Sequence, residues 1–148
     1  MNKLSSQLLS KLLCHNEQVD ITISGISMNP TFKEGDIVTI QKSSQYSPGD
    51  ILVYPYKEGT LLIHRLLHID KRYFCKGDNA FRIEDISVDQ IIGKAVLVNK
   101  QPIPEWPKWK IDLSYGIGKT FRQCHYDIVK TKETSLYKQY AALVLQKQ

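Results

Sequence analysis

Six short strand-like runs, separated by turn sequences, fill the first hundred residues of this chain and restrict its fold more than any other feature. The clearest run, Val19-Asp20-Ile21-Thr22-Ile23-Ser24, alternates apolar and polar residues with the period of two that a half-buried strand requires. Turns with Gly-Asp pairs, such as Gly35-Asp36 and Gly49-Asp50, separate the runs. The predicted strands cover residues 19–24, 36–41, 50–56, 60–68, 72–76 and 91–98.

This order of elements predicts a mostly β fold of the α+β class. Short strands joined by tight turns, with no long helices between them, favour a coiled antiparallel sheet or partly closed barrel over a doubly wound parallel sheet. Before the strands, leucines recur at helical spacing, so residues from about 3 to 14 are expected to form a short amphipathic helix.

The last third of the chain differs in composition from the part before it. Three prolines at 102, 104 and 107 mark a break, and residues from about 133 to 146 repeat apolar side chains at helical spacing. The region around Gly116 and Gly118 carries no strong signal. We therefore divide the chain into an N-terminal helical segment, a β domain and a C-terminal extension with a helical tail. Their expected bounds are residues 1–18, 19–100 and 101–148.

Charge is concentrated in the C-terminal extension. Residues 1–100 contain 12 lysines and arginines against 11 acidic residues, whereas residues 101–148 contain 8 against 4, within a total net charge of +5. A basic helical tail is typical of a solvated surface, and it also suits weak association with an anionic membrane surface. A nucleic-acid partner is not expected, because no aromatic-rich basic strand occurs and the segment before the strands is too short for a helix-turn-helix.

The remaining composition favours a soluble cytoplasmic protein without a metal or cofactor. The cysteines Cys14, Cys75 and Cys124 are few, odd in number and far apart, which argues against a disulfide framework and a zinc site. His15 and His125 have no companions at metal-ligand spacing. No run approaches 18 apolar residues, and polar residues interrupt the N-terminal leucines, so neither a membrane span nor a signal peptide is predicted.

Two residues suggest chemistry. Ser27 lies between Gly25 and Pro30 in a turn sequence where substrate could approach the backbone, and the Ser27 N–H could stabilise an oxyanion. His64 lies in a strand-like run whose alternation places Leu62, His64 and Leu66 on one face. A serine nucleophile and a histidine base are the core of a serine hydrolase, although each residue alone is also compatible with a purely structural role.

Together these segments resemble the signal peptidase I family and its relatives, which include the LexA-type repressors. The nucleophile box is Gly25-Ile26-Ser27-Met28-Asn29-Pro30, and it is followed in family order by Glu34-Gly35-Asp36 and Gly49-Asp50-Ile51. The base-bearing strand appears as Ile63-His64-Arg65, and the late box as Lys76-Gly77-Asp78-Asn79 with Asp85 after it. The resemblance covers residues from about 19 to 98.

The departures from the family pattern are also informative. Most bacterial signal peptidases have lysine where this chain has His64, and the His-Arg form resembles the endoplasmic-reticulum and archaeal type. Gly25 stands where some members carry a hydroxyl that assists the oxyanion. The transmembrane anchor expected before the nucleophile box does not occur in these 148 residues, so we expect a short, anchorless member. Such members are sometimes associated with the biosynthesis of ribosomally made, modified peptides.

The resemblance implies a serine endopeptidase that uses a Ser27–His64 dyad and no cofactor. Asp85, or less favourably Asp78, is expected to accept a hydrogen bond from the second imidazole nitrogen of His64. Asp78 could instead shape its Gly-Asp turn. Gly25, Met28, Pro30 and Arg65 are expected to support the site, Met28 by packing behind the nucleophile.

The expected partner is a peptide or protein substrate, namely a cytoplasmic precursor or leader peptide. Two alternatives remain open at this stage: a signal peptidase held peripherally at a membrane, and a regulator that keeps the fold without catalysis. The sequence does not specify the oligomeric state.

Overall fold

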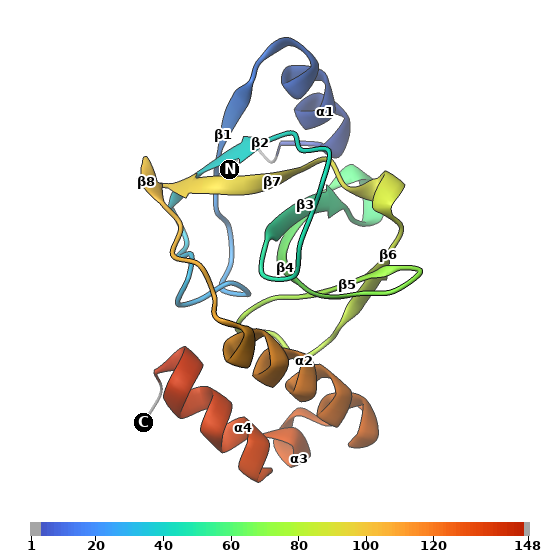
Figure 1. Ribbon diagram of the computed structural model, residues 1–148, viewed down its shortest axis with the longest axis vertical. Coiled ribbons are helices and arrows are strands. Elements are labelled where there is room, and N and C mark those ends of the chain that lie inside the picture. Colours follow the sequence, from blue (N-terminus) through green and yellow to red (C-terminus); the bar gives the residue numbers. More distant parts are fainter. Residues whose placement is uncertain (1–3, 147–148) are drawn as a thin grey trace.

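The computed structural model describes residues 4–146, and an antiparallel sheet forms its centre (Figure 1). Eight strands occur in this part of the chain, in the order β1-β2-β7-β3-β4-β5-β6, with β8 paired to β7. The sheet is strongly coiled and does not close, because β1 and β6 each pair with one neighbour only. The strands are β1 (Gln18–Thr22), β2 (Ile37–Gln41), β3 (Ile51–Pro55), β4 (Leu61–Ile69), β5 (Tyr73–Lys76), β6 (Glu84–Ile86), β7 (Gly93–Val98) and β8 (Gln101–Pro102).

The predicted mostly β, α+β class is confirmed, and each of the six predicted strands has an observed counterpart. Two short strands, β6 with three residues and β8 with two, were not predicted from the sequence. Two short 3-10 turns, η1 (Lys57–Gly59) and η2 (Val88–Gln90), connect strands. Because β6 has only three residues, its alternation is too short to be recognised in the sequence.

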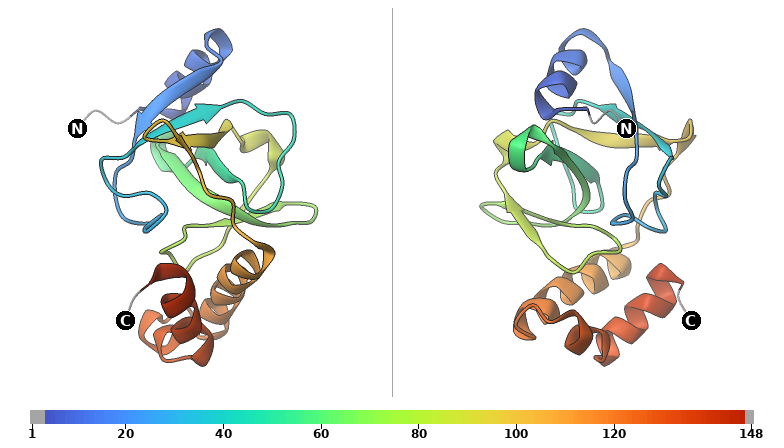
Figure 2. Two further views of the ribbon diagram at one scale, coloured as in Figure 1. Left: turned by 60° about the vertical axis from the view of Figure 1, so that its left-hand side comes forward. Right: turned by 180° about the vertical axis from the view of Figure 1, so that it is seen from behind.

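The N-terminal helix forms as predicted within the described residues. Helix α1 (Ser6–His15) is capped at its N-terminus by Ser5, whose Oγ accepts a hydrogen bond from the Leu8 N–H at 3.1 Å. Its buried leucines Leu9 and Leu13 pack into a core that also contains Val38 of β2 and Val53 of β3. The helix therefore covers one end of the sheet (Figure 2). Residue 3, where the predicted helix began, lies outside the described residues.

Strand β3 lies between two cores. Ile51 and Val53 point into the core that contains α1, whereas Leu52 and Tyr54 point into a second core with Leu66 and Cys75, among others. These four of the five β3 residues are buried, because both faces of the strand are covered. The second core includes Leu62 and Leu66 of β4, the residues predicted to share a face with His64.

The C-terminal extension is helical over most of its length and lies against the end of the sheet opposite α1 (Figures 1 and 2). It contains α2 (Lys108–Gln123), α3 (Ile128–Lys132), α4 (Ser135–Tyr140) and a final π-helical turn, η3 (Ala141–Leu145). The predicted terminal helix corresponds to α4 and η3. Helix α2 was missed, because its interior glycines are weak helix formers. The buried face of α2 includes both small and large residues: Ile111, Ser114, Ile117, Gly118 and Phe121.

Gly118 allows α2 to approach the segment that leads into β6. A Cβ atom at position 118 would lie 2.2 Å from Cγ1 and 2.3 Å from Cδ1 of Ile83. We predict that Gly118→Ala lowers the free energy of unfolding by about 1–3 kcal/mol, because overpacking outweighs the gain in helix propensity. Urea denaturation followed by circular dichroism measures this change.

Gly116→Ala is the matched control in the same helix. Its Cβ would meet only the end of a flexible side chain, Leu136 Cδ2, at 3.1 Å. The control should keep most of the helix-propensity gain of up to about 1 kcal/mol. Equal effects of the two substitutions would show that the contact between Gly118 and Ile83 does not restrict the helix.

Candidate active site

The segment between β1 and β2 forms an irregular loop that presents Ser27. Gly25 adopts φ +88°, a left-handed conformation that favours glycine, and its N–H donates to Glu34 Oε1 at 3.3 Å. Met28 is 3% exposed, and its Sδ accepts a hydrogen bond from the Asp78 N–H at 3.4 Å. Pro30 follows a cis peptide bond and is exposed.

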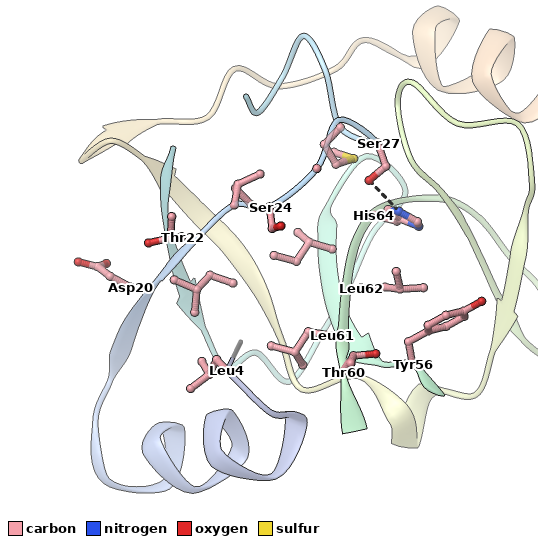
Figure 3. Close-up of a pocket in the computed structure, with 15 residues that line it drawn as sticks. Leu4, Asp20, Thr22, Ser24, Ser27, Tyr56, Thr60, Leu61, Leu62 and His64 are labelled. Atoms are coloured by element: carbon pink, nitrogen blue, oxygen red, sulfur yellow. Dashed lines mark hydrogen bonds between the residues drawn. The ribbon is translucent and has the colours of Figure 1, made fainter. Parts of the chain in front are cut away.

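Ser27 and His64 lie side by side although 37 positions separate them. His64 is buried in β4, and its Nε2 lies 3.2 Å from Ser27 Oγ (Figure 3). Strand β4 holds the imidazole firmly because β3 pairs with it on one side, with Leu52 opposite His64. The structure therefore brings together the two residues that the sequence predicted as nucleophile and base.

The partner of the second imidazole nitrogen is Glu84 of β6. Glu84 Oε1 lies 2.5 Å from His64 Nδ1 and also accepts a hydrogen bond from the buried Tyr54 hydroxyl at 2.8 Å. A carboxylate only accepts, so the Nδ1 atom must carry the proton. The lone pair of Nε2 then faces Ser27 Oγ, which is the tautomer that a general base requires.

The prediction that Asp85 or Asp78 orients His64 is wrong. Glu84 and Asp85 are neighbours on a strand, so their side chains point to opposite faces of the sheet. Asp85 points to solvent and pairs with Arg72, and both side chains are about half exposed. Asp78 is fully buried and pairs with Arg65. Of these two adjacent residues of β6, only Glu84 has a side chain on the face of the sheet from which its carboxylate can reach His64.

Arg65 and Asp78 form a buried ion pair behind the site. Arg65 Nε and Nη2 donate to the two carboxylate oxygens of Asp78, each at 2.9 Å, and Nη1 donates to the Gly49 carbonyl at 2.8 Å. Thr31 Oγ1, from the nucleophile loop, also donates to Asp78 at 2.5 Å. The Trp106 ring covers the guanidinium, with Cζ 3.8 Å from the ring centroid. Arg65 therefore anchors Asp78 and the Gly49 carbonyl behind the Ser27–His64 pair.

Burial raises the pKa of two groups close to Glu84, the Tyr54 hydroxyl and the Cys75 thiol. It raises the pKa of the Tyr54 hydroxyl far above its usual range, and the nearby Glu84 charge acts in the same direction. Burial also raises the pKa of Cys75 to about 12, again with help from Glu84. Tyr54 therefore remains a hydrogen-bond donor to Glu84, and Cys75 remains a thiol, at neutral pH.

The late box, residues 76–79, packs against the nucleophile loop. The Asn79 N–H donates to the Ser27 carbonyl at 2.8 Å, and Asn79 Nδ2 donates to the Ile26 carbonyl at 3.2 Å. Position 77 admits only glycine, because a Cβ atom there would lie 2.6 Å from the Ser27 carbonyl oxygen and 3.2 Å from His64 Nε2. The box thus sets the position of the Ser27 backbone relative to His64.

A groove of about 490 Å³ leads from the Ser27–His64 pair toward α1 (Figure 3). Residues 20–25, which comprise the end of β1 and its continuation, line one wall, and residues 60–64 line the other. Both walls offer open strand edges among the described residues. Strand β1 pairs only with β2, and the pairing of β4 with β5 begins at Arg65, beyond the groove.

Sequence reasoning found Ser27, His64 and Arg65 but missed Glu84, Tyr54 and Trp106. The available signal for Glu84 was that it directly precedes Asp85 in the family's late segment.

In residues 4–146, no three His, Cys, Asp or Glu side chains are grouped so that they could hold a metal ion. Within the same range, no helix has the length and apolar character needed to cross a membrane.

Comparison with known families assigns the chain. Residues 4–96, more than half of the sequence, match the model of the family described as Peptidase S24-like. The chain belongs to the S24-like peptidase family. The expected membership of the LexA-type serine peptidase superfamily is thereby confirmed. A search of curated proteins found no match.

The residues matched by the S24-like family model include Ser27, His64 and Glu84, which are joined by hydrogen bonds through the two nitrogens of His64. It ends before the C-terminal extension begins. Helices α2, α3 and α4 therefore lie outside the part of this S24-like chain that the family model matches.

Lys76 is the one fully buried lysine among the described residues of this S24-like chain. Its Nζ donates to the Gly77 and Ala80 carbonyls at 2.9 and 2.8 Å and lies 5.0 Å from the Tyr140 ring centroid. Burial lowers the pKa of Lys76 to about 7, although the negative charge of Asp78 opposes this shift. The folded chain therefore binds the Lys76 proton more weakly than the unfolded chain does.

This difference in proton binding predicts a pH-dependent stability. Between pH 7 and the ordinary lysine pKa of 10.5, the unfolded chain holds a proton that the folded chain lacks. The contribution of Lys76 to the free energy of unfolding should therefore rise with pH, by up to about 1.4 kcal/mol per unit. We expect a steeper rise between pH 7 and 9 in the wild type than in Lys76→Met, measured by urea denaturation.

The exposed Lys71 provides the control, because Lys71→Met should keep the wild-type slope. If Lys76→Met shows the same slope as the wild type, Lys76 titrates normally in the folded protein and the prediction is wrong.

Proposed function

We propose that this protein is a serine endopeptidase in which Ser27 is the nucleophile, His64 the general base and Glu84 the residue that orients His64. One observation carries the proposal: a continuous line of contacts joins Ser27 Oγ, the two nitrogens of His64 and Glu84 Oε1. A nucleophile within reach of a base, with the base held by a carboxylate, is the arrangement that activates a serine hydroxyl. Membership of a peptidase family supports the same chemistry.

In the proposed reaction, Ser27 Oγ attacks the carbonyl carbon of the scissile peptide bond while His64 Nε2 takes the hydroxyl proton. Glu84 stabilises the positive charge that develops on the imidazole. His64 then gives the proton to the leaving amine, the C–N bond breaks, and an ester to Ser27 remains. Water hydrolyses this ester, with His64 again acting as base.

The oxyanion of each tetrahedral intermediate needs hydrogen-bond donors. Gly25 has no side chain for this purpose, and its N–H points to Glu34. Among the described residues, the Ser27 N–H has no intramolecular partner, so it is the donor we assign to the oxyanion.

The groove suits an extended peptide. The open edges of β1 and of residues 61–64 could each pair with a substrate backbone, so that the bound peptide adds a strand between them. From His64 to Leu61 a strand advances about 10 Å, which gives room for roughly three to four substrate residues on that side of the scissile bond. The groove therefore recognises the backbone over a short segment.

We assign the substrate to the class of cytoplasmic precursor or leader peptides. Three cysteines remain free in the structure, Cys14 being exposed, and this supports a reducing compartment. The resemblance to short peptidases associated with ribosomally made, modified peptides supports the same class. A peripheral membrane location would instead place the enzyme with signal peptidases.

The nucleophile is tested by Ser27→Ala, which should abolish cleavage of a peptide library followed by mass spectrometry. It should also abolish labelling by a fluorophosphonate probe, because the reactive hydroxyl is gone. Folding should be unaffected, since the loop is held by backbone hydrogen bonds. Ser24→Ala is the matched control, because Ser24 lines the same groove without contacting His64. Wild-type rates in Ser27→Ala would disprove the assignment of Ser27 as the nucleophile, whereas a wild-type protein that neither cleaves the library nor takes up the probe would favour a non-catalytic regulator.

The orienting carboxylate is tested by comparing two neighbouring residues. Glu84→Gln should lower kcat by on the order of 10²–10⁴-fold, because an amide can hold His64 in the wrong tautomer. Asp85→Asn removes a carboxylate of β6 that points to solvent, and kcat should stay within about twofold of the wild type. The opposite ranking of the two variants would restore Asp85 as the partner of His64.

A further inference from the structure

Tyr140, at the end of α4, links the C-terminal extension to the late box of the active site by a hydrogen bond. The Tyr140 ring is 1% exposed and belongs to the core of the extension, together with Ile117 and Val144. Its hydroxyl leaves this core and donates to the backbone carbonyl of Asp78 at 2.5 Å. Burial raises the pKa of Tyr140, so the hydroxyl remains a donor at neutral pH.

The peptide bond between Asp78 and Asn79 is hydrogen-bonded at both ends. Its carbonyl accepts from Tyr140, and its N–H donates to the carbonyl of Ser27 at 2.8 Å. A peptide group is planar, so fixing the direction of its C=O also fixes the direction of its N–H. Hydrogen bonds in such a chain also polarise and strengthen one another. Tyr140 and Ser27 are therefore linked through one rigid unit.

Other contacts hold the groups on either side of this peptide. Lys76 Nζ lies over the Tyr140 ring and donates to the carbonyls of Gly77 and Ala80, which flank the peptide. Ser114 Oγ lies 3.3 Å from the Tyr140 hydroxyl and holds it from α2. The Ser27 carbonyl that receives the Asn79 N–H belongs to the residue whose Oγ must stay 3.2 Å from His64 Nε2.

We propose that Tyr140 is a positioning residue for Ser27, and that the helical extension thereby forms part of the peptidase site. The inference rests on the proposed function and deepens it. The Tyr140 hydroxyl orients the Asp78–Asn79 peptide, this peptide holds the Ser27 carbonyl, and Ser27 Oγ and N–H are placed for attack and for oxyanion binding. The extension acts on catalysis without touching the substrate.

Tyr140→Phe tests this role, because it removes one hydroxyl and keeps the ring over Lys76. In the full chain we expect kcat for a cleaved library peptide to fall by about 10- to 100-fold, the loss typical of a displaced catalytic group. KM should stay within about twofold, since the groove is unchanged. Hydrogen exchange of the Asn79 amide, measured by NMR, should become about 5- to 10-fold faster.

Tyr137→Phe is the matched control. Tyr137 lies one turn earlier in α4, is also buried, and stacks on Phe81, whereas its hydroxyl makes no hydrogen bond to the late box. It should change neither kcat nor Asn79 exchange. Both variants are assayed well below their unfolding temperatures, so that a general loss of stability does not alter kcat.

Two results would overturn the inference: a kcat for Tyr140→Phe equal to that of Tyr137→Phe, or a lower kcat with unchanged Asn79 exchange. Failure of the proposed function is recognised separately, by Ser27→Ala cleaving as fast as the wild type. In that case the Asn79 exchange rate still decides whether Tyr140 positions the Ser27 loop.

Discussion

The buried ion pair between Arg65 and Asp78 is the interaction on which the rest of the site depends. It joins β4, the late box and, through Thr31, the nucleophile loop, and Trp106 of the extension covers it. Removing one partner of such a pair leaves an uncompensated buried charge, which typically costs about 3–5 kcal/mol. The pair is therefore tolerable only because both carboxylate oxygens and all three guanidinium nitrogens are hydrogen-bonded.

Two neighbouring residues of β4, His64 and Arg65, have different roles in the proposed site. His64 and Arg65 point to opposite faces of the strand, so one reaches Ser27 and Glu84 while the other anchors Asp78. The late box meets both, because its Gly77 lies against His64 and its Asp78 against Arg65. Any displacement of β4 would thus disturb the proposed catalytic line and its structural support together.

The structural surroundings of the site extend beyond the residues that the family model matches and include part of the C-terminal extension. The family match covers residues 4–96, yet the ring of Trp106 and the hydroxyl of Tyr140 contact groups directly behind the nucleophile loop. A basic tail seemed from its charge to be a solvated surface. Its described lysines are indeed mostly exposed, but its buried face packs against Ile83 and the late box.

The sequence by itself determined six of the described strands and pointed to Ser27 and His64, because alternation, turn residues and the order of the motifs are local properties. It did not identify Glu84, since choosing between residues 84 and 85 requires the register of a three-residue strand, which pairing with β5 decides. It did not predict α2, because Gly116 and Gly118 disfavour a helix that tertiary packing stabilises. The contact of Tyr140 with the Asp78 carbonyl spans 62 positions, and only the folded chain brings such distant groups together.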